Sequence, residues 1–126
     1  MRLLLDSHLA LWWQIGDQRA VALQHTVESS DEVMVSQASL WEFAIKASLG
    51  KLNVDLRAFA GEVERLGFRW LPITSEHVFA VADLPFIDGH HDPFDRMLVA
   101  QAVSESLMFL TADRRLGPYG DLVRVV

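Results

Sequence analysis

The chain contains no cysteine among its 126 residues. This absence excludes disulfide bonds, zinc sites with thiolate ligands and a cysteine nucleophile. Basic residues are also scarce, since eleven lysines and arginines stand against seventeen aspartates and glutamates, for a formal net charge of −6. A chain this acidic is not expected to coat nucleic acid through bulk positive charge, although a local site can still meet a phosphate.

Long hydrophobic runs are missing as well. The apolar run near the N-terminus ends at Asp6, which makes it too short for a signal peptide or a membrane span. We therefore expect a cytoplasmic protein with no membrane partner. Apolar residues nevertheless make up 51% of the chain, and this length predicts one domain over residues 1–126 with a single core.

Strands and helices are expected to alternate along the chain. The predicted strands are residues 2–5, 33–35, 69–73, 107–110 and 122–126. The predicted helices are residues 7–13, 19–29, 36–49, 56–66, 75–82 and 93–103, with a loop at 84–89 and a turn or short helix at 112–116. This alternation predicts an α/β fold with a mostly parallel sheet of about four to five strands, flanked by helices on both faces.

The stretch His90–Val103, with the sequence HHDPFDRMLVAQAV, organises this scheme. Asp92 is a suitable N-cap, Pro93 fits the first helical position, and Asp95 falls in the first turn. The helix that follows is apolar over most of its surface, so it is expected to be buried. The sequence thus drives a helix into the core with carboxylates at its beginning.

Four acids are expected at one edge of the sheet. Asp6 and Asp113 follow predicted strands, Asp95 begins the buried helix, and Glu42 lies in the helix after the second strand. Functional groups of parallel α/β sheets gather beyond the carboxyl ends of the strands. Each acid also has a structural interpretation, because Asp6 and Asp113 are suitable N-caps, Asp95 can form a capping box, and Glu42 can pair with Lys46.

Taken together, the four carboxylates favour chemistry over capping. Converging carboxylates raise one another's pKa values or bind a compensating cation. A site with oxygen ligands alone indicates Mg²⁺ or Mn²⁺. One or two such ions would suit metal-assisted hydrolysis of a phosphodiester.

The segments that carry these acids resemble PIN-domain ribonucleases, and among them the VapC-type toxins of bacterial toxin–antitoxin pairs. The matching segments are LLLDSHLALWW (3–13), VSQASLWEFAIKASLGKL (35–52), LPIT (71–74), HHDPFDRMLVAQA (90–102) and FLTADRRL (109–116). They run from one end of the chain to the other. The resemblance implies a single PIN domain, Mg²⁺- or Mn²⁺-dependent RNA cleavage, a homodimer and inhibition by a VapB-like antitoxin.

Carried over residue by residue, the acidic quartet of the family falls on Asp6, Glu42, Asp95 and Asp113. Asp6 and Asp95 match the principal metal ligands, and the other two acids complete the cluster directly or through water. Ser7 matches a hydroxyl position that holds Asp6 or a metal-bound water. The loop of residues 85–89 is longer than in the family pattern.

An acidic chain must meet RNA through a local basic strip. The candidate residues are Lys46, Arg96 and Arg114, whereas Lys51 and Arg115 are interpreted as solvated surface charges. Arg96 can alternatively pair with Asp92.

Other conspicuous side chains have structural interpretations. His90 and His91 are expected to orient the loop before Asp92 rather than to bind metal. The four tryptophans are assigned to packing. The segment Leu9–Trp13 is a candidate contact for a second copy or an antitoxin.

Two other functions remain open from the residues alone. A receiver-like phospho-acceptor domain is also α/β with acids at its strand ends, but it needs an acid pair after the first strand and a lysine after a late strand. Here Asp6 is followed by Ser7, and Thr111-Ala112-Asp113 contains no lysine. A catalytically silent PIN-fold binding module is the other alternative, which the presence of all four acids weakens.

Overall fold

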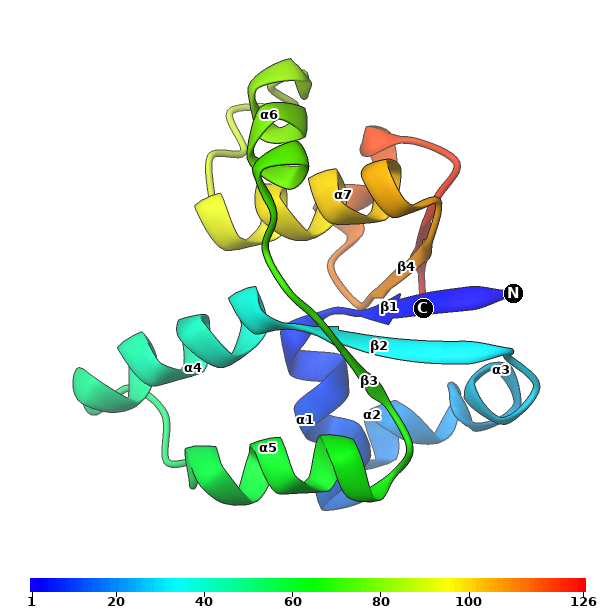
Figure 1. The fold of residues 1–126 in the computed structure, drawn as a ribbon, viewed down its shortest axis with the longest axis vertical. Helices are drawn as coiled ribbons and strands as arrows, with labels where there is room; N and C mark the ends of the chain where they lie inside the picture. The colour runs from blue at the N-terminus through cyan, green and yellow to red at the C-terminus, as the bar shows by residue number, and fades with distance from the viewer.

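The fold is built on one parallel sheet. A computed structural model describes all residues 1–126, and its five strands lie in the order β3-β2-β1-β4-β5 (Figure 1). All four strand pairings are parallel. The strands are β1 (Arg2–Leu5), β2 (Glu32–Ser36), β3 (Arg69–Leu71), β4 (Met108–Thr111) and β5 (Val123–Val125). The predicted α/β fold with a mostly parallel sheet is confirmed.

Helices cover the sheet on both sides, with α6 and α7 on one side and α1, α2, α3 and α5 on the other (Figure 1). The helices are α1 (Ser7–Ile15), α2 (Gln18–Val21), α3 (Gln24–Glu28), α4 (Gln37–Ser48), α5 (Leu56–Arg65), α6 (Ser75–Asp83), α7 (Pro93–Glu105) and the 3₁₀ helix η1 (Arg114–Tyr119). None of them has both the length and the apolar character needed to span a membrane.

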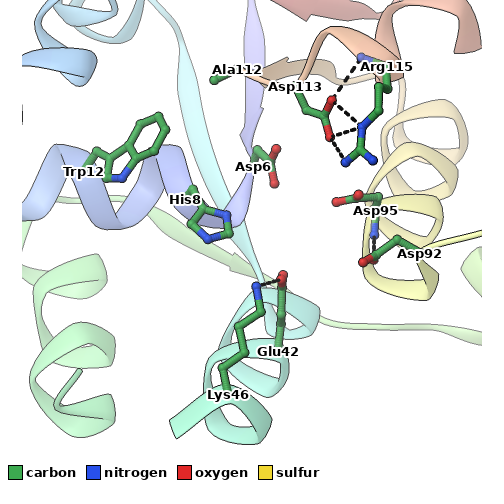
Figure 2. A pocket seen from close by; sticks show the side chains of 10 residues that line it. All are labelled: Asp6, His8, Trp12, Glu42, Lys46, Asp92, Asp95, Ala112, Asp113 and Arg115. Carbon is green, nitrogen blue, oxygen red and sulfur yellow. Dashed lines mark hydrogen bonds and ion pairs between the residues drawn. The ribbon is translucent and has the colours of Figure 1, made fainter. Parts of the chain in front are cut away.

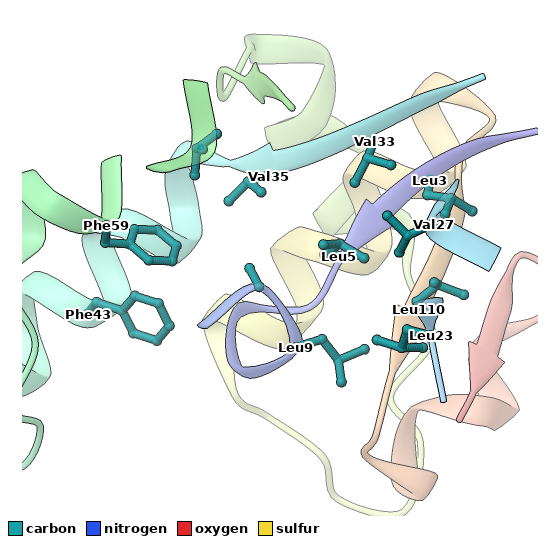
Figure 3. Close-up of a cluster of buried hydrophobic side chains, with 12 residues drawn as sticks. Leu3, Leu5, Leu9, Leu23, Val27, Val33, Val35, Phe43, Phe59 and Leu110 are labelled. Atoms are coloured by element: carbon teal, nitrogen blue, oxygen red, sulfur yellow. The ribbon is translucent and has the colours of Figure 1, made fainter. Parts of the chain in front are cut away.

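The two faces of the sheet bury separate apolar clusters, because successive side chains of a strand point to opposite faces. Leu3 and Leu5 of β1 belong to the cluster that includes Phe59 of α5 (Figure 3). Leu4 belongs to the cluster on the other face, which includes Leu98 of α7. Apolar burial on both faces explains why β1 reads as a continuous apolar run.

Helix α7 begins as the sequence predicts. Pro93 is the first helical residue, and the Asp92 carboxylate accepts hydrogen bonds from the backbone N–H groups of Phe94 and Asp95 at 2.9 and 3.0 Å. These bonds satisfy two donors that have no partner within the helix. The first turn is thereby fixed, and the Asp95 side chain is carried on a well-defined backbone.

The body of α7 is buried less uniformly than its composition predicts. Leu98 and Val99 are buried, but Val103 is 50% exposed. Two polar residues, Arg96 and Gln101, are buried instead. Apolar composition therefore predicts that the helix lies in the core, but it does not identify the face that is buried. That face also includes polar residues that contact neighbouring segments.

Two element predictions need correction. The helix expected at residues 19–29 is two short helices, α2 and α3, separated at Ala22 and Leu23. Ala20, Leu23 and Val27 are all buried, but their spacing is that of one continuous helical face, so the apolar pattern gives no sign of the break. The strand expected at residues 69–73 ends at Leu71, because Pro72 has no N–H to donate within a sheet.

The segment Leu9–Trp13, the candidate contact for a second copy or an antitoxin, is largely packed against the core. Leu9 and Ala10 are buried, while Leu11, Trp12 and Trp13 pack against the same core cluster. The helix that contains them lies against the sheet, so much of their apolar surface is used for folding. Leu11, Trp12 and Trp13 keep part of their surface exposed, and a contact with a second copy or an antitoxin stays a prediction.

Candidate active site

Asp6 directly follows β1 and is nearly buried, at 8% exposure. Its carboxylate accepts a hydrogen bond from the Ser7 backbone N–H at 2.7 Å and another from the Thr111 hydroxyl at 2.6 Å. Thr111 is the last residue of β4, the strand beside β1, and the parallel register pairs Leu5 with Leu110. Neighbouring strand ends therefore hold this carboxylate in one orientation.

Thr111 was not among the predicted site residues. Besides donating to Asp6, its hydroxyl oxygen accepts the backbone N–H of Asp113 at 3.0 Å. The signal in the sequence was a polar residue at the end of a buried strand, two positions before an acid. Its role depends on the pairing of β1 with β4, which joins residues more than a hundred positions apart.

Ser7 supports Asp6 through its backbone rather than through its hydroxyl. The Ser7 hydroxyl is buried and donates to the hydroxyl of Ser39 in α4 at 2.7 Å. The expectation that this hydroxyl holds Asp6 is therefore wrong for this structure. Its contact fixes α1 against α4, the helix that carries Glu42.

Glu42 lies on the buried side of α4, with 7% exposure, and its carboxylate pairs with Lys46 Nζ at 2.7 Å. The ion pair expected between Glu42 and Lys46 is therefore present, and both residues line the same cleft, while a role of Glu42 as a metal ligand stays a prediction. Asp113 has a comparable partner in Arg115, whose guanidinium binds both carboxylate oxygens, with Nη2 2.7 Å from Oδ2 (Figure 2). Arg115 is thus more than the solvated surface charge that the sequence suggested.

Asp95 projects from the first turn of α7 toward the same space as Asp6 and Asp113 (Figure 2). A cleft of about 330 Å³ opens there at the carboxyl end of the sheet. Its lining residues are Asp6, His8, Trp12, Glu42, Lys46, Asp92, Asp95, Ala112, Asp113 and Arg115. The tertiary structure therefore brings all four predicted acids to one cleft, together with the capping residue Asp92.

The acids of the cleft differ in their electrostatic surroundings. Burial and, to a lesser degree, the negative charges of Asp6 and Asp92 together raise the pKa of Asp95 to about 7. The pKa of Asp6 is also raised, chiefly by burial, although the Thr111 hydrogen bond opposes the shift. The Arg115 side chain instead holds the pKa of Asp113 below its usual value. The centre of the cleft thus carries negative charge that the protein itself does not balance.

His90 stands behind Asp95. Its Nε2 lies 3.2 Å from Oδ2 of Asp95, but the two groups are not aligned for a hydrogen bond. This atom is the one buried side-chain nitrogen or oxygen in the chain that has no hydrogen-bond partner. The ring also packs edge-on against Tyr119, which keeps it between Asp95 and η1. His90 therefore contacts a carboxylate of the cleft, and its role in orienting the loop stays a prediction.

Arg96 is not available to RNA. It is 6% exposed, and its guanidinium donates to the Pro85 carbonyl at 2.9 Å and to the Tyr119 hydroxyl at 3.1 Å. The carbonyls of Val81 and Leu84, at the end of α6, accept further hydrogen bonds from it at 3.3 Å. The predicted RNA contact is therefore wrong, and so is the alternative pair with Asp92. Arg96 fixes the loop after α6 to α7.

Oxygen ligands in this cleft are of the type that Mg²⁺ and Mn²⁺ prefer. In the conformation described, no three acidic or histidine side chains of the chain are grouped closely enough to hold an ion. Glu42 and Asp113 are instead turned toward Lys46 and Arg115. The donor chemistry fits a hard cation, and an enclosed site would require these two carboxylates to leave their internal partners.

Comparisons with known proteins agree with this architecture. Residues 3–121 match the family model described as PIN domain. The chain is 30% identical over 123 residues to ribonuclease VapC22 of Mycobacterium tuberculosis, an alignment that covers 90% of this chain and 88% of that relative.

Solved structures resemble the whole chain at low sequence identity. One is VapBC2 from Rickettsia felis bound to a DNA fragment from its promoter, with a TM-score of 0.69, 13% identity, and coverage of 99% of this chain and 98% of that one. Another is FitAcB from Neisseria gonorrhoeae, with a TM-score of 0.60, 21% identity, and coverage of 93% and 90%. At these identities the likeness shows the fold alone.

Proposed function

Because the chain belongs to the PIN-domain family, we propose that it is a VapC-type ribonuclease that hydrolyses RNA phosphodiester bonds as the toxin of a toxin–antitoxin pair. The observation that carries this proposal is the gathering of Asp6, Glu42, Asp95 and Asp113 in one cleft at the carboxyl end of a parallel sheet. The 30% identity to a ribonuclease supports the same reaction class. The proposed site of action is the cytoplasm, where such an enzyme would meet its RNA.

The proposed cofactor is Mg²⁺ or Mn²⁺, as one or two ions held by these four acids. The raised pKa of Asp95 supports this, because a bound cation would relieve the crowding of negative charge that causes part of the shift. When bound, a divalent cation would activate water and neutralise charge on the phosphate under attack.

The side chains around the acids have definable duties in this proposal. Thr111 and the Ser7 N–H keep Asp6 oriented, so that ligand would need little reorganisation. Lys46 and Arg115 neutralise Glu42 and Asp113 in the cation-free protein. These two pairs would have to open or rearrange for all four acids to act together.

The proposed partners are RNA, a VapB-like antitoxin and a second copy of the chain. An apolar groove of about 280 Å³ supports protein association, and it is lined by residues of α4, α6 and α7 that include Ala38, Val78 and Phe94. Trp41, which also lines this groove, is 58% exposed. An exposed aromatic residue at an apolar groove is typical of protein contact surfaces.

A catalytically silent binding module is the second candidate. The observation in its favour is that the acids do not form a closed ion site in this conformation. A ligand that binds only the native state must stabilise it, so a titration with Mg²⁺ or Mn²⁺ separates the two candidates. The ribonuclease proposal expects the melting temperature to rise with cation concentration, and an unchanged value would favour the silent module.

The direct test is cleavage of single-stranded RNA by the purified protein, freed of any antitoxin. We expect cleavage with Mg²⁺ or Mn²⁺, its loss in EDTA, and its loss in the Asp6→Asn variant with the fold retained by circular dichroism. Asp121→Asn is the matched control, because Asp121 is exposed and lies outside the cleft. Equal cleavage by the parent and Asp6→Asn proteins would contradict the proposal.

A further inference from the structure

A second cavity, also of about 330 Å³, lies beside the acidic cleft. Its lining residues are Ile87, Asp88, Gly89, His90, Arg114, Arg115 and Pro118. Arg115 lines both cavities, and His90 joins them because its Nε2 lies 3.2 Å from Asp95. A chain molecule that occupied the acidic cleft could therefore continue directly into the second cavity.

The charge of the second cavity is opposite to that of the cleft. The cleft contains five carboxylates against Lys46 and Arg115, whereas the second cavity contains two arginines against the single carboxylate of Asp88. Arg115 is already bound to Asp113. Arg114 is exposed, and its side chain forms no hydrogen bond or ion pair within the protein, so its guanidinium is free to bind a ligand.

We propose that this cavity binds a backbone phosphate of the RNA adjacent to the scissile one, with Arg114 as its principal ligand. The inference rests on the proposed ribonuclease function and adds to it a site for substrate binding. A guanidinium presents paired N–H donors that match phosphate oxygens. A phosphate bound beside the scissile one would offset part of the repulsion between RNA and the acidic cleft.

Asp88 limits how strongly this cavity attracts phosphate. It is exposed and adopts a φ of 47°, in the left-handed region where aspartate and asparagine are the best-tolerated residues other than glycine. The Asp88→Asn change therefore removes a negative charge without requiring a new backbone conformation. Arg114→Gln and Asp88→Asn should change RNA binding in opposite directions from the same cavity.

The test measures kcat and KM for cleavage of a single-stranded RNA oligonucleotide across a series of salt concentrations. Arg114→Gln should raise KM by roughly three- to tenfold at low salt and leave kcat within about twofold, because it removes a contact made before and during reaction. The slope of log kcat/KM against log salt should become shallower by about 0.7, the value for one phosphate on a single strand. Asp88→Asn should lower KM.

Arg124→Gln and Asp121→Asn are the matched controls, since both residues are exposed, form no ion pair and lie outside both cavities. Arg124→Gln changes the net charge as Arg114→Gln does, and Asp121→Asn changes it as Asp88→Asn does. The kinetics of both controls should nevertheless stay close to those of the parent. If Arg114→Gln and Arg124→Gln gave the same KM and salt slope, the phosphate site would be excluded. This conclusion would hold even if Arg114→Gln weakened the binding of an antitoxin. If the parent cleaved no RNA with either cation, the proposed function itself would fail.

Discussion

Helix α7 contributes to two clusters of polar side chains. The polar groups of one cluster are in part without partners within the protein, and those of the other have them. The first is the acidic cleft at its beginning, around Asp95. The second, which we call the Gln101 network, lies further along the helix and consists of Ser36, Thr74, His77, Gln101 and Glu105. Both clusters contain buried polar groups, but the network satisfies them within the protein and the cleft does not.

In the Gln101 network, donors and acceptors match. The Ser36 hydroxyl donates to Gln101 Oε1 at 2.6 Å, and the Thr74 N–H donates to Nδ1 of the fully buried His77 at 3.1 Å. With Nδ1 accepting, Nε2 carries the proton and donates to Glu105 at 2.8 Å. Satisfied buried polar groups of this kind rigidify a fold and specify its packing.

The acidic cleft has the opposite character. Asp95 carries a pKa of about 7 because burial and neighbouring negative charges disfavour its ionised form, and His90 Nε2 beside it has no hydrogen bond. Unbalanced charge in a concave site is typical of ligand-binding and catalytic positions. The comparison teaches that burial of a polar group does not by itself reveal its purpose, whereas the state of its partners does.

The largest effect is expected from a substitution in the acidic cleft that leaves the Gln101 network unchanged. Asp95→Asn should reduce RNA cleavage on the order of a hundredfold or more, because it removes a proposed cation ligand. Asp92→Asn is the matched control, since asparagine is an equally good N-cap and preserves the start of α7. Its cleavage rate should stay within about tenfold of the parent. Comparable rates for the parent and Asp95→Asn would remove Asp95 from the proposed site.

The second prediction concerns a substitution in the Gln101 network that leaves the acidic cleft unchanged. Gln101→Ala removes the acceptor of the buried Ser36 hydroxyl and leaves a cavity, so the free energy of unfolding should fall by about 2–4 kcal/mol. Urea unfolding measures this loss. Gln24→Ala, on an exposed helix surface, should change stability by less than about 0.5 kcal/mol. Divalent-cation affinity of folded Gln101→Ala should equal that of the parent, and a marked decrease would show that the two clusters are coupled.

The third prediction concerns pH. The folded-state pKa of Asp95 is about 7 against an ordinary value of 3.8, so the folded state holds this proton more tightly than the unfolded state does. Its contribution to stability is therefore complete below about pH 4 and is lost as pH rises through 7. In cation-free buffer, Asp95→Asn should gain roughly 1–3 kcal/mol of unfolding free energy relative to the parent between pH 4 and 8, after allowance for solvent screening.

Urea unfolding of both proteins at several pH values measures this difference and cancels the contributions of groups they share. Added Mg²⁺ or Mn²⁺ should reduce it, because a bound cation stabilises ionised Asp95. A difference between the two proteins that does not change with pH would contradict the assignment of the raised pKa.

The smallest effect is expected from loss of the ion pair between Arg115 and Asp113 at the edge of the cleft. Arg115→Gln removes the guanidinium that lowers the pKa of Asp113, so this carboxylate becomes free for a cation. Divalent-cation affinity should increase by about two- to fivefold, the range expected for loss of an exposed ion pair. Calorimetric titration provides the measurement, with Arg124→Gln as control. Weaker cation binding by Arg115→Gln than by the control would show that the pair helps to hold Asp113 in place.

Much of the fold could be predicted because its signals lie close together along the chain. Apolar runs mark the strands, Asp92-Pro93 marks the start of α7, and Asp6 and Asp113 follow strands. The break between α2 and α3 could not be predicted, because Ala20, Leu23 and Val27 have the spacing of one continuous helical face and no glycine or proline marks the interruption. Secondary structure was therefore most predictable where local signals and tertiary packing agreed.

The sequence by itself determined which acids the protein brings to the end of its sheet, since the order of strands and helices along the chain sets their positions. Only the tertiary structure decided what each side chain contacts. It joined Thr111 to Asp6 through the pairing of β4 with β1, and it buried Arg96 under the loop after α6. The physical reason is that hydrogen-bond partners come from segments far apart in the chain, and their proximity is fixed only when the sheet and its helices pack.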